Sequence, residues 1–183
     1  METKIIICGL GGQGVVFLTR LLANTALANG HAVMVSETHG MSQRGGSVLS
    51  HLKIDGNQAP LIQHGTADLL LALEVDEAAR HLTYLRPGGM ALVDAAQGLR
   101  PELDADIARL NLRVHCLPAS QMALDLGAPA VANVILAGFA AGFAAMPFSF
   151  ATLRQALQDG SGRNRDLNLA ALDAGFRSVV SSQ

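Results

Sequence analysis

The hydrophobic positions of this chain fall into short apolar runs separated by longer amphipathic segments. Residues 4–8 form a β-branched apolar run that ends in glycines, a pattern typical of a buried strand. In residues 15–29 leucines recur close to the helical period and Gly30 follows, which predicts a helix with a C-terminal glycine. Residues 32–35 predict a second strand, so the chain opens with a βαβ unit.

The next segment departs from a simple doubly wound fold. Residues 47–54 predict a third strand, and Asp55-Gly56 after it predicts a turn. The stretch between residues 35 and 47 is too short for a crossover helix, which a parallel connection normally contains. The third strand is therefore expected to be antiparallel or peripheral, in a mixed sheet.

Strands and helices alternate again after this point. Strands are expected at residues 68–73, 90–93 and 114–117, a helix at 76–85 closed by Pro87-Gly88-Gly89, and helices from residue 120 onward. The sequence thus predicts an α/β fold with three layers, α/β/α. Its sheet is mostly parallel but mixed, Rossmann-like at the N-terminus, and its C-terminal part is helical. The length and the lack of a Pro/Ser-rich linker favour a single domain over residues 1–183.

The segment 130–146 is almost wholly apolar, yet it is shorter than a bilayer span. It contains Asn133 and ends at Pro147, so a helix outside the membrane is expected. Its apolar content exceeds what one buried face needs. We expect one face on the core and another against a partner subunit, with Gly138 and Gly142 allowing close approach.

Composition narrows the classes of function. Half of the residues are apolar, only 15% are charged and the net charge is −2, so no basic surface for nucleic acid is expected. The N-terminus has no signal-peptide pattern, which indicates the cytoplasm. Cys8 and Cys116 lack the spacing of metal ligands, and so do the histidines at positions other than 39. His51 is expected on a strand face that meets solvent. No metal site is predicted in this chain.

The first chemical motif is a glycine-rich turn between the first strand and the first helix. Glycines allow backbone amides to approach a phosphate, and the helix N-terminus adds partial positive charge. Glu37 lies beyond the second strand, roughly where a ribose-binding acid would be. Three interpretations stay open: a dinucleotide site, a turn that serves packing alone, or a site for another phosphate or loop at a subunit boundary. The motif residues are Gly9, Gly11, Gly12, Gln13 and Gly14.

The second motif places several chemical groups on one glycine-rich segment. Glu37 and His39 could transfer a proton, Arg44 could clamp a carboxylate or phosphate, and the last two glycines would admit a ligand or a neighbouring backbone. A solvated loop with an incidental salt bridge is the alternative, but we favour a functional or interface loop. Its candidate site residues are Glu37, His39, Gly40, Met41, Ser42, Gln43, Arg44, Gly45 and Gly46.

The runs from Ile7 to Val16 and from Glu37 to Val48, in this order and spacing, resemble the gamma domain of 2-oxoacid:ferredoxin oxidoreductases. The likeness covers nearly the whole chain and is greatest to the small (beta) subunit of indolepyruvate ferredoxin oxidoreductase. Gly88-Gly89 before a strand ending at Asp94, and Asn133 in an Ala/Gly-rich helix, also fit.

The resemblance implies an enzyme that oxidatively decarboxylates a 2-oxoacid, with thiamine diphosphate, Mg²⁺ and iron–sulfur clusters, ferredoxin as acceptor and CoA as co-substrate. The chain has no thiamine-binding motif and too few cysteines for a cluster, so these cofactors are expected on a large partner subunit. The chain would complete the active-site junction, be inactive alone and self-associate when isolated. Arg44 is the candidate anion contact, and Glu37 and His39 would order the loop. The alternatives are a free-standing NAD(P)- or FAD-binding dehydrogenase and a regulatory nucleotide-binding module.

Overall fold

The computed structural model describes residues 2–40, 45–56, 59–143, 145–160 and 164–180. Its sheet has six strands in the order β2-β3-β1-β4-β5-β6. All neighbouring strands pair in parallel except β3, which is antiparallel to both β1 and β2. The strands are β1 (Thr3–Leu10), β2 (Val33–His39), β3 (Ser47–Ile54), β4 (Ala67–Ala72), β5 (Leu85–Asp94) and β6 (Arg113–Leu117).

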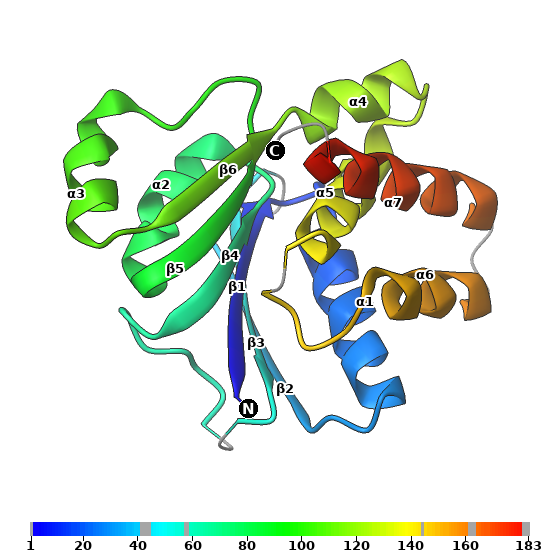
Figure 1. The fold of residues 1–183 in the computed structure, drawn as a ribbon, viewed down its shortest axis with the longest axis horizontal. Coiled ribbons are helices and arrows are strands. Elements are labelled where there is room, and N and C mark those ends of the chain that lie inside the picture. The colour runs from blue at the N-terminus through cyan, green and yellow to red at the C-terminus, as the bar shows by residue number, and fades with distance from the viewer. Residues whose placement is uncertain (1, 41–44, 57–58, 144, 161–163, 181–183) are drawn as a thin grey trace.

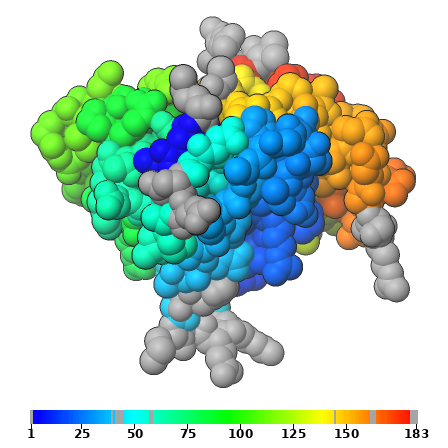
Figure 2. All heavy atoms as spheres, turned by 90° about the horizontal axis from the view of Figure 1, so that it is seen from below, coloured from blue at the N-terminus to red at the C-terminus, as the bar shows by residue number. Residues whose placement is uncertain are grey.

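Helices cover both faces of the sheet and give the expected three layers. The helices α2 and α3 lie on one face, while α1 and α4 to α7 lie on the other (Figure 1). Seen from below, α1 lies beside α6 (Figure 2). The helices are α1 (Val15–Ala28), α2 (Val75–His81), α3 (Asp104–Arg109), α4 (Ala119–Asp125), α5 (Ala132–Ala141), α6 (Phe150–Asp159) and α7 (Arg165–Val180). No helix within the described residues is long and apolar enough to cross a membrane.

The first βαβ unit forms for the reasons that the sequence indicates. The side chains of Ile5, Ile6 and Ile7 are fully buried, because helices cover β1 on both faces. The helix α1 ends where Gly30 takes a left-handed conformation with φ +82°. The Gly30 amide then donates to the Leu27 carbonyl at 3.0 Å, which satisfies an acceptor at the helix end.

The reversed strand β3 confirms the prediction of a mixed sheet, and of the two expected alternatives, antiparallel or peripheral, it is antiparallel. It lies between β1 and β2, so that β2 forms the edge of the sheet. A short connection lets β3 fold straight back along β2, and the other edge of β3 pairs through backbone hydrogen bonds with β1, from Thr3–Ile54 to Leu10–Ser47.

The apolar segment 130–146 is not one long helix with a face left for a partner. Residues Pro129–Val131 form a 3₁₀ turn, and α5 ends at Ala141. Within this chain α5 packs against β5, α1 and α7, and its residues 133–140 are all buried. A Cβ added to Gly138 would lie 2.0 Å from the Leu172 carbonyl oxygen of α7. The close approach predicted for this segment therefore serves α7, and the interface expected on α5 was wrong.

The helix expected at residues 76–85 is also shorter, and the strand after it is longer. The helix α2 ends at His81, a 3₁₀ turn covers Leu82–Tyr84, and β5 begins at Leu85. The Pro87-Gly88-Gly89 run lies inside β5, where the pairing with β4 shifts register between Ala67 and Leu69. Glycine suits such an irregularity, because a Cβ on Gly89 would lie 2.8 Å from the Arg86 carbonyl oxygen.

His51 is buried, with 3% of its surface exposed, which corrects the expectation that it meets solvent. The segment between β3 and β4 covers its face of the sheet, and the Ile62 amide donates to His51 Nδ1 at 3.1 Å. The ring of Tyr84 contacts His51 edge-on, with a centroid distance of 5.5 Å. The loop before β4 thus supplies the hydrogen bond that the buried His51 ring needs, and the alternation of residues along β3 gives no sign of this loop contact.

This burial predicts a pH dependence of stability. Loss of hydration lowers the pKa of His51, His81 and His115 below the ordinary value of 6.5. At pH values below 6.5 the unfolded chain then binds more protons than the folded chain, so the free energy of unfolding should fall as the pH drops. Urea denaturation between about pH 7.5 and 5.5 measures this slope. A free energy that stays constant or rises toward acid pH would contradict the prediction.

Candidate functional site

A crevice with a volume of about 820 Å³ opens at the carboxyl ends of β1, β4, β5 and β6. From β1 the chain continues toward β2 on one side, and from β4 it continues toward β5 on the other, so the crevice lies where the winding of the sheet reverses (Figure 1). Ligands of open α/β folds bind at such a switch point. The crevice is lined by Gln13, Leu73, Glu74, Val75, Asp94, Ala95, Ala96, Gln97, Gly98, Leu99, Arg100, Pro101, Pro118, Ser120, Gln121 and Leu124.

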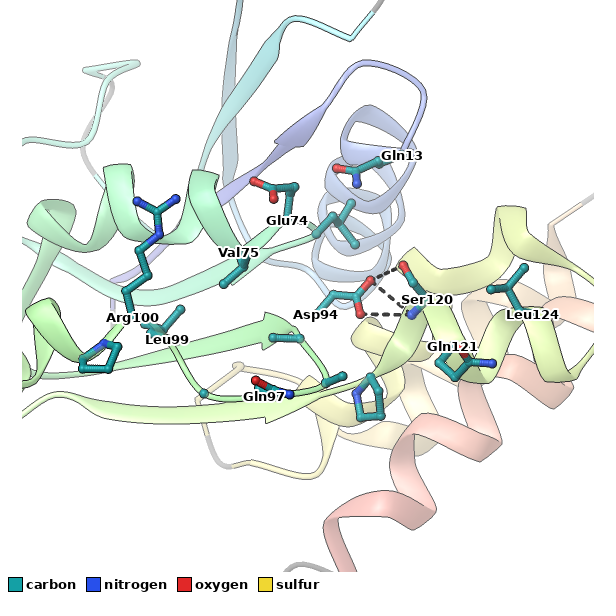
Figure 3. Close-up of a pocket in the computed structure, with 16 residues that line it drawn as sticks. Gln13, Glu74, Val75, Asp94, Gln97, Leu99, Arg100, Ser120, Gln121 and Leu124 are labelled. Atoms are coloured by element: carbon teal, nitrogen blue, oxygen red, sulfur yellow. Dashed lines mark hydrogen bonds between the residues drawn. The ribbon is translucent and has the colours of Figure 1, made fainter.

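Asp94, the last residue of β5, joins this strand to the start of α4 on one wall of the crevice. Its carboxylate accepts hydrogen bonds from the Ser120 backbone amide at 3.0 Å and the Ser120 hydroxyl at 2.5 Å (Figure 3). These bonds satisfy donors in the first turn of α4. A smaller pocket of about 140 Å³ shares Asp94 and Ser120 with the crevice and reaches Ala132 of α5.

Glu74 lies on the opposite wall of the crevice and also bonds to the start of a helix. It precedes α2, and its side chain accepts a hydrogen bond from the Glu77 amide at 2.8 Å. Arg100 forms an ion pair with Asp76 in the first turn of the same helix. The two acids that line the crevice, Glu74 and Asp94, are thus already bound to helix amides. The sequence placed Asp94 at the end of a predicted strand but did not indicate its contact with Ser120, nor the place of Glu74 and Arg100 on the same crevice.

The glycine-rich turn reaches the crevice through Gln13, which lines it. Gln13 Oε1 accepts from the Leu10 amide at 2.7 Å, and the Gln13 amide donates to the Leu10 carbonyl at 3.1 Å. A Cβ on Gly9 would lie 2.8 Å from Gln13 Oε1 and 3.0 Å from Leu73 Cβ. Packing alone therefore accounts for the glycine at position 9.

Asn133 of α5 lies directly against the end of this turn. Its side-chain amide donates to the Gly14 carbonyl at 3.2 Å, although the two residues are 119 positions apart in sequence. Gly14 has φ +84°, and a Cβ there would lie 2.2 Å from Asn133 Nδ2. Gly14 and Asn133 thus fix the start of α1 together, while Gly12, with φ +98°, has nothing within 4 Å of its Cβ position.

The two sequence motifs meet through their backbones. The Gly11 amide donates to the Gly46 carbonyl at 2.9 Å, and a Cβ on Gly11 would lie 3.5 Å from the Gly45 amide nitrogen. The Gly40 amide donates to the Ser47 carbonyl at 2.8 Å, where β2 and β3 meet. The structure therefore brings the C-terminal end of the second motif, Gly45-Gly46, against the glycine-rich turn.

Glu37 and His39 lie on the edge strand β2, in the N-terminal part of the second motif. Glu37 is half-buried and pairs with Ser50 of β3, and the backbone of His39 pairs with Val48. Glu37 is not among the described residues that line the crevice. The residues Met41, Ser42, Gln43 and Arg44 lie outside the described part of the chain.

The strand order removes the main argument for a dinucleotide site. A ribose-binding acid follows a strand that neighbours the glycine-rich turn. Here β3 separates β2 from β1, so Glu37 is two strands away, roughly 10 Å at the usual strand spacing. The turn keeps the glycine spacing of the fingerprint but has no neighbouring acid from β2.

Two further kinds of chemistry, metal binding and thiol reactions, depend on His, Cys, Asp and Glu side chains of the described residues. Within them, no group of three or more His, Cys, Asp or Glu side chains is arranged to hold a metal ion. Cys8 and Cys116 are free thiols, and burial raises the pKa of both.

Comparisons with known proteins agree with the fold and the motifs. The pyruvate ferredoxin/flavodoxin oxidoreductase family matches residues 4–178. The indolepyruvate oxidoreductase subunit IorB of Archaeoglobus fulgidus is 34% identical, with 100% of this chain and 98% of that protein covered. A keto/oxoacid ferredoxin oxidoreductase gamma subunit from Geobacter sulfurreducens superposes with a TM-score of 0.76 at 25% identity, covering 98% of this chain and 99% of its own.

A larger protein carries the same fold as one part of its chain. In a 2-oxoglutarate:ferredoxin oxidoreductase from Magnetococcus marinus, the match covers all of this chain and 31% of that one, with a TM-score of 0.76 at 20% identity. This chain belongs to the pyruvate ferredoxin/flavodoxin oxidoreductase family. Its relatives are subunits of 2-oxoacid oxidoreductases, and they favour this class over a free-standing NAD(P)- or FAD-dependent dehydrogenase.

Proposed function

We propose that this chain is the small subunit of an indolepyruvate-type 2-oxoacid:ferredoxin oxidoreductase, and that it closes the junction at which a large subunit carries out the chemistry. Full-length similarity to IorB supports the choice of an indolepyruvate-type enzyme. The large subunit would hold thiamine diphosphate, Mg²⁺ and the iron–sulfur clusters and reduce ferredoxin, in the cytoplasm. Thiamine diphosphate would supply the stabilised carbanion that decarboxylation of the 2-oxoacid requires.

One observation carries the proposal for this chain: the C-terminal end of the second motif meets the glycine-rich turn, whose Gln13 lines the switch-point crevice. Backbone amides and small residues at such an edge suit an anionic or phosphorylated group. We propose that these elements face the active-site junction and guide the 2-oxoacid or CoA there. Arg44 would contact the anion, and Glu37 and His39 would order the segment.

The crevice can be blocked without touching the core. Gln97 is exposed and lines the crevice (Figure 3), so a Gln97→Trp side chain would occupy its mouth. We expect this variant to lower kcat/KM of the reconstituted enzyme by at least about tenfold, because a displaced substrate or subunit loses its reacting geometry. Its free energy of unfolding should change by no more than about 0.5 kcal/mol, as for other surface substitutions.

The matched control is Gln155→Trp, because Gln155 is an exposed glutamine on α6 and does not line the crevice. It should leave both stability and activity close to those of the wild type. Steady-state kinetics with the purified large subunit, a 2-oxoacid, CoA and ferredoxin compare the two variants. Equal activity of both variants and the wild type would show that the crevice has no part in the proposed function.

A further inference from the structure

Glu77 is a buried carboxylate that the crevice itself does not use. It lies in the first turn of α2, and only 1% of its surface is exposed. A buried carboxylate is costly unless other groups compensate its charge. Glu77 Oε1 accepts a hydrogen bond from Arg80 at 2.6 Å, Glu77 Oε2 accepts one from the Ser47 hydroxyl at 2.5 Å, and His81 Nε2 lies 3.4 Å from Oε2.

The direction of this side chain differs from what its position in the helix favours. Glu77 follows the capping residue Glu74 by three positions, and in a capping box an acid at this position reaches back to the cap backbone amide. Here Glu77 uses only its backbone amide for the cap, which the Glu74 carboxylate accepts at 2.8 Å. The Glu77 carboxylate instead extends to another element, the first residue of β3.

Ser47, which receives this contact, lies at the meeting point of the two motifs. It follows Gly46, whose carbonyl accepts from the Gly11 amide at 2.9 Å. Its own carbonyl accepts from the Gly40 amide at 2.8 Å, and it pairs with Leu10 in the sheet. A group that fixes Ser47 therefore acts on Gly40, on Gly46 and on the glycine-rich turn together.

We propose that Glu77 is a positioning residue, which holds the second motif against the glycine-rich turn through the Ser47 hydroxyl. The backbone amide of Glu77 also donates to Glu74, which lines the crevice. The first turn of α2 therefore contacts both the crevice and the end of the second motif. Glu77 does not contact substrate; it acts through Ser47. The consequence for catalysis rests on the proposed function, whereas the positioning itself concerns this chain alone.

Ser47 offers a sharper test than Glu77, because a change at the fully buried acid could prevent folding. We expect Ser47→Ala to speed hydrogen exchange of the Gly11 and Gly40 amides by about tenfold, since a hydrogen bond to a charged group is lost. Ser47→Thr, which keeps the hydroxyl on a strand, should restore slow exchange. Amide exchange followed by NMR on the isolated chain measures both.

The control is Thr66→Ala, which removes a hydroxyl that donates to the Gln63 carbonyl at 2.8 Å, in the segment between β3 and β4. It should leave exchange at Gly11 and Gly40 unchanged. In the reconstituted enzyme, Ser47→Ala should lower kcat by roughly tenfold with KM nearly unchanged, and Ser47→Thr should recover kcat. In a Glu77→Gln background that still folds, adding Ser47→Ala should lower kcat little further, because Glu77→Gln has already weakened the hydrogen bond that Ser47 donates.

The two claims can fail separately. If Ser47→Ala and Thr66→Ala give the same exchange at Gly11 and Gly40, Glu77 does not position the motif. If exchange responds as expected but kcat is equal in Ser47→Ala and the wild type, the positioning has no catalytic role and that part of the proposal is wrong. An inactive wild-type reconstitution would refute the proposed function, while the exchange comparison would still decide the positioning.

Discussion

Replacing Gly175 with alanine is expected to lower the free energy of unfolding by about 3 kcal/mol or more, a large effect for one methyl group. Gly175 lies buried on α7, where a Cβ would be 1.9 Å from the Ile135 carbonyl oxygen and 2.9 Å from the Phe139 amide nitrogen of α5. Both atoms belong to helix backbone, so no side chain can move to make room. The two helices would have to separate, and the buried contacts of α5 would loosen.

The control for this prediction is Gly98→Ala. A Cβ on Gly98 meets nothing within 4 Å, and the residue is exposed. Urea denaturation should therefore separate the two variants clearly, with Gly98→Ala within about 0.5 kcal/mol of the wild type. A loss of less than about 1 kcal/mol for Gly175→Ala would mean that the α5–α7 crossing is looser than described.

The crossing of α5 and α7 also explains an error of sequence reasoning. An apolar segment at residues 130–146 has more hydrophobic surface than one helical face can bury, which favoured a partner subunit. The partner is α7 of the same chain, and no local pattern in the sequence shows that these two helices pack together. Small residues on both helices, Gly138 and Gly175, carry the contact, and their pairing depends on the tertiary fold.

The sheet could be predicted in kind but not in strand order. The glycine-rich turn, the terminal Gly30 and the short connection before residue 47 are local signals, and they correctly indicated the βαβ unit and the antiparallel strand. The insertion of β3 between β1 and β2 is decided by long-range pairing, which no local pattern encodes. This insertion separates Glu37 from the turn and buries His51.

The candidate site was predicted in part for the same reason. The sequence indicated both glycine-rich motifs, and the contact between Gly11 and Gly46 now shows how their ends meet. The roles of their side chains stay predictions. Sequence reasoning missed the pairing of Asp94 with Ser120 and the inward direction of Glu77, although each carboxylate could be seen beside a predicted strand or in a predicted helix. Which donor satisfies a buried acid becomes clear only from the folded chain.

The central claim is that this chain acts only as one part of a 2-oxoacid oxidoreductase, and the assay of separate and combined subunits tests it most directly. The purified chain, the purified large subunit and their mixture are each supplied with 2-oxoacids including indolepyruvate, thiamine diphosphate, Mg²⁺ and CoA. Ferredoxin serves as acceptor, and NAD⁺, NADP⁺ and FAD are tested in parallel. We expect ferredoxin reduction above background from the mixture alone. Turnover by the isolated chain with any acceptor, or full activity of the large subunit without it, would contradict the account.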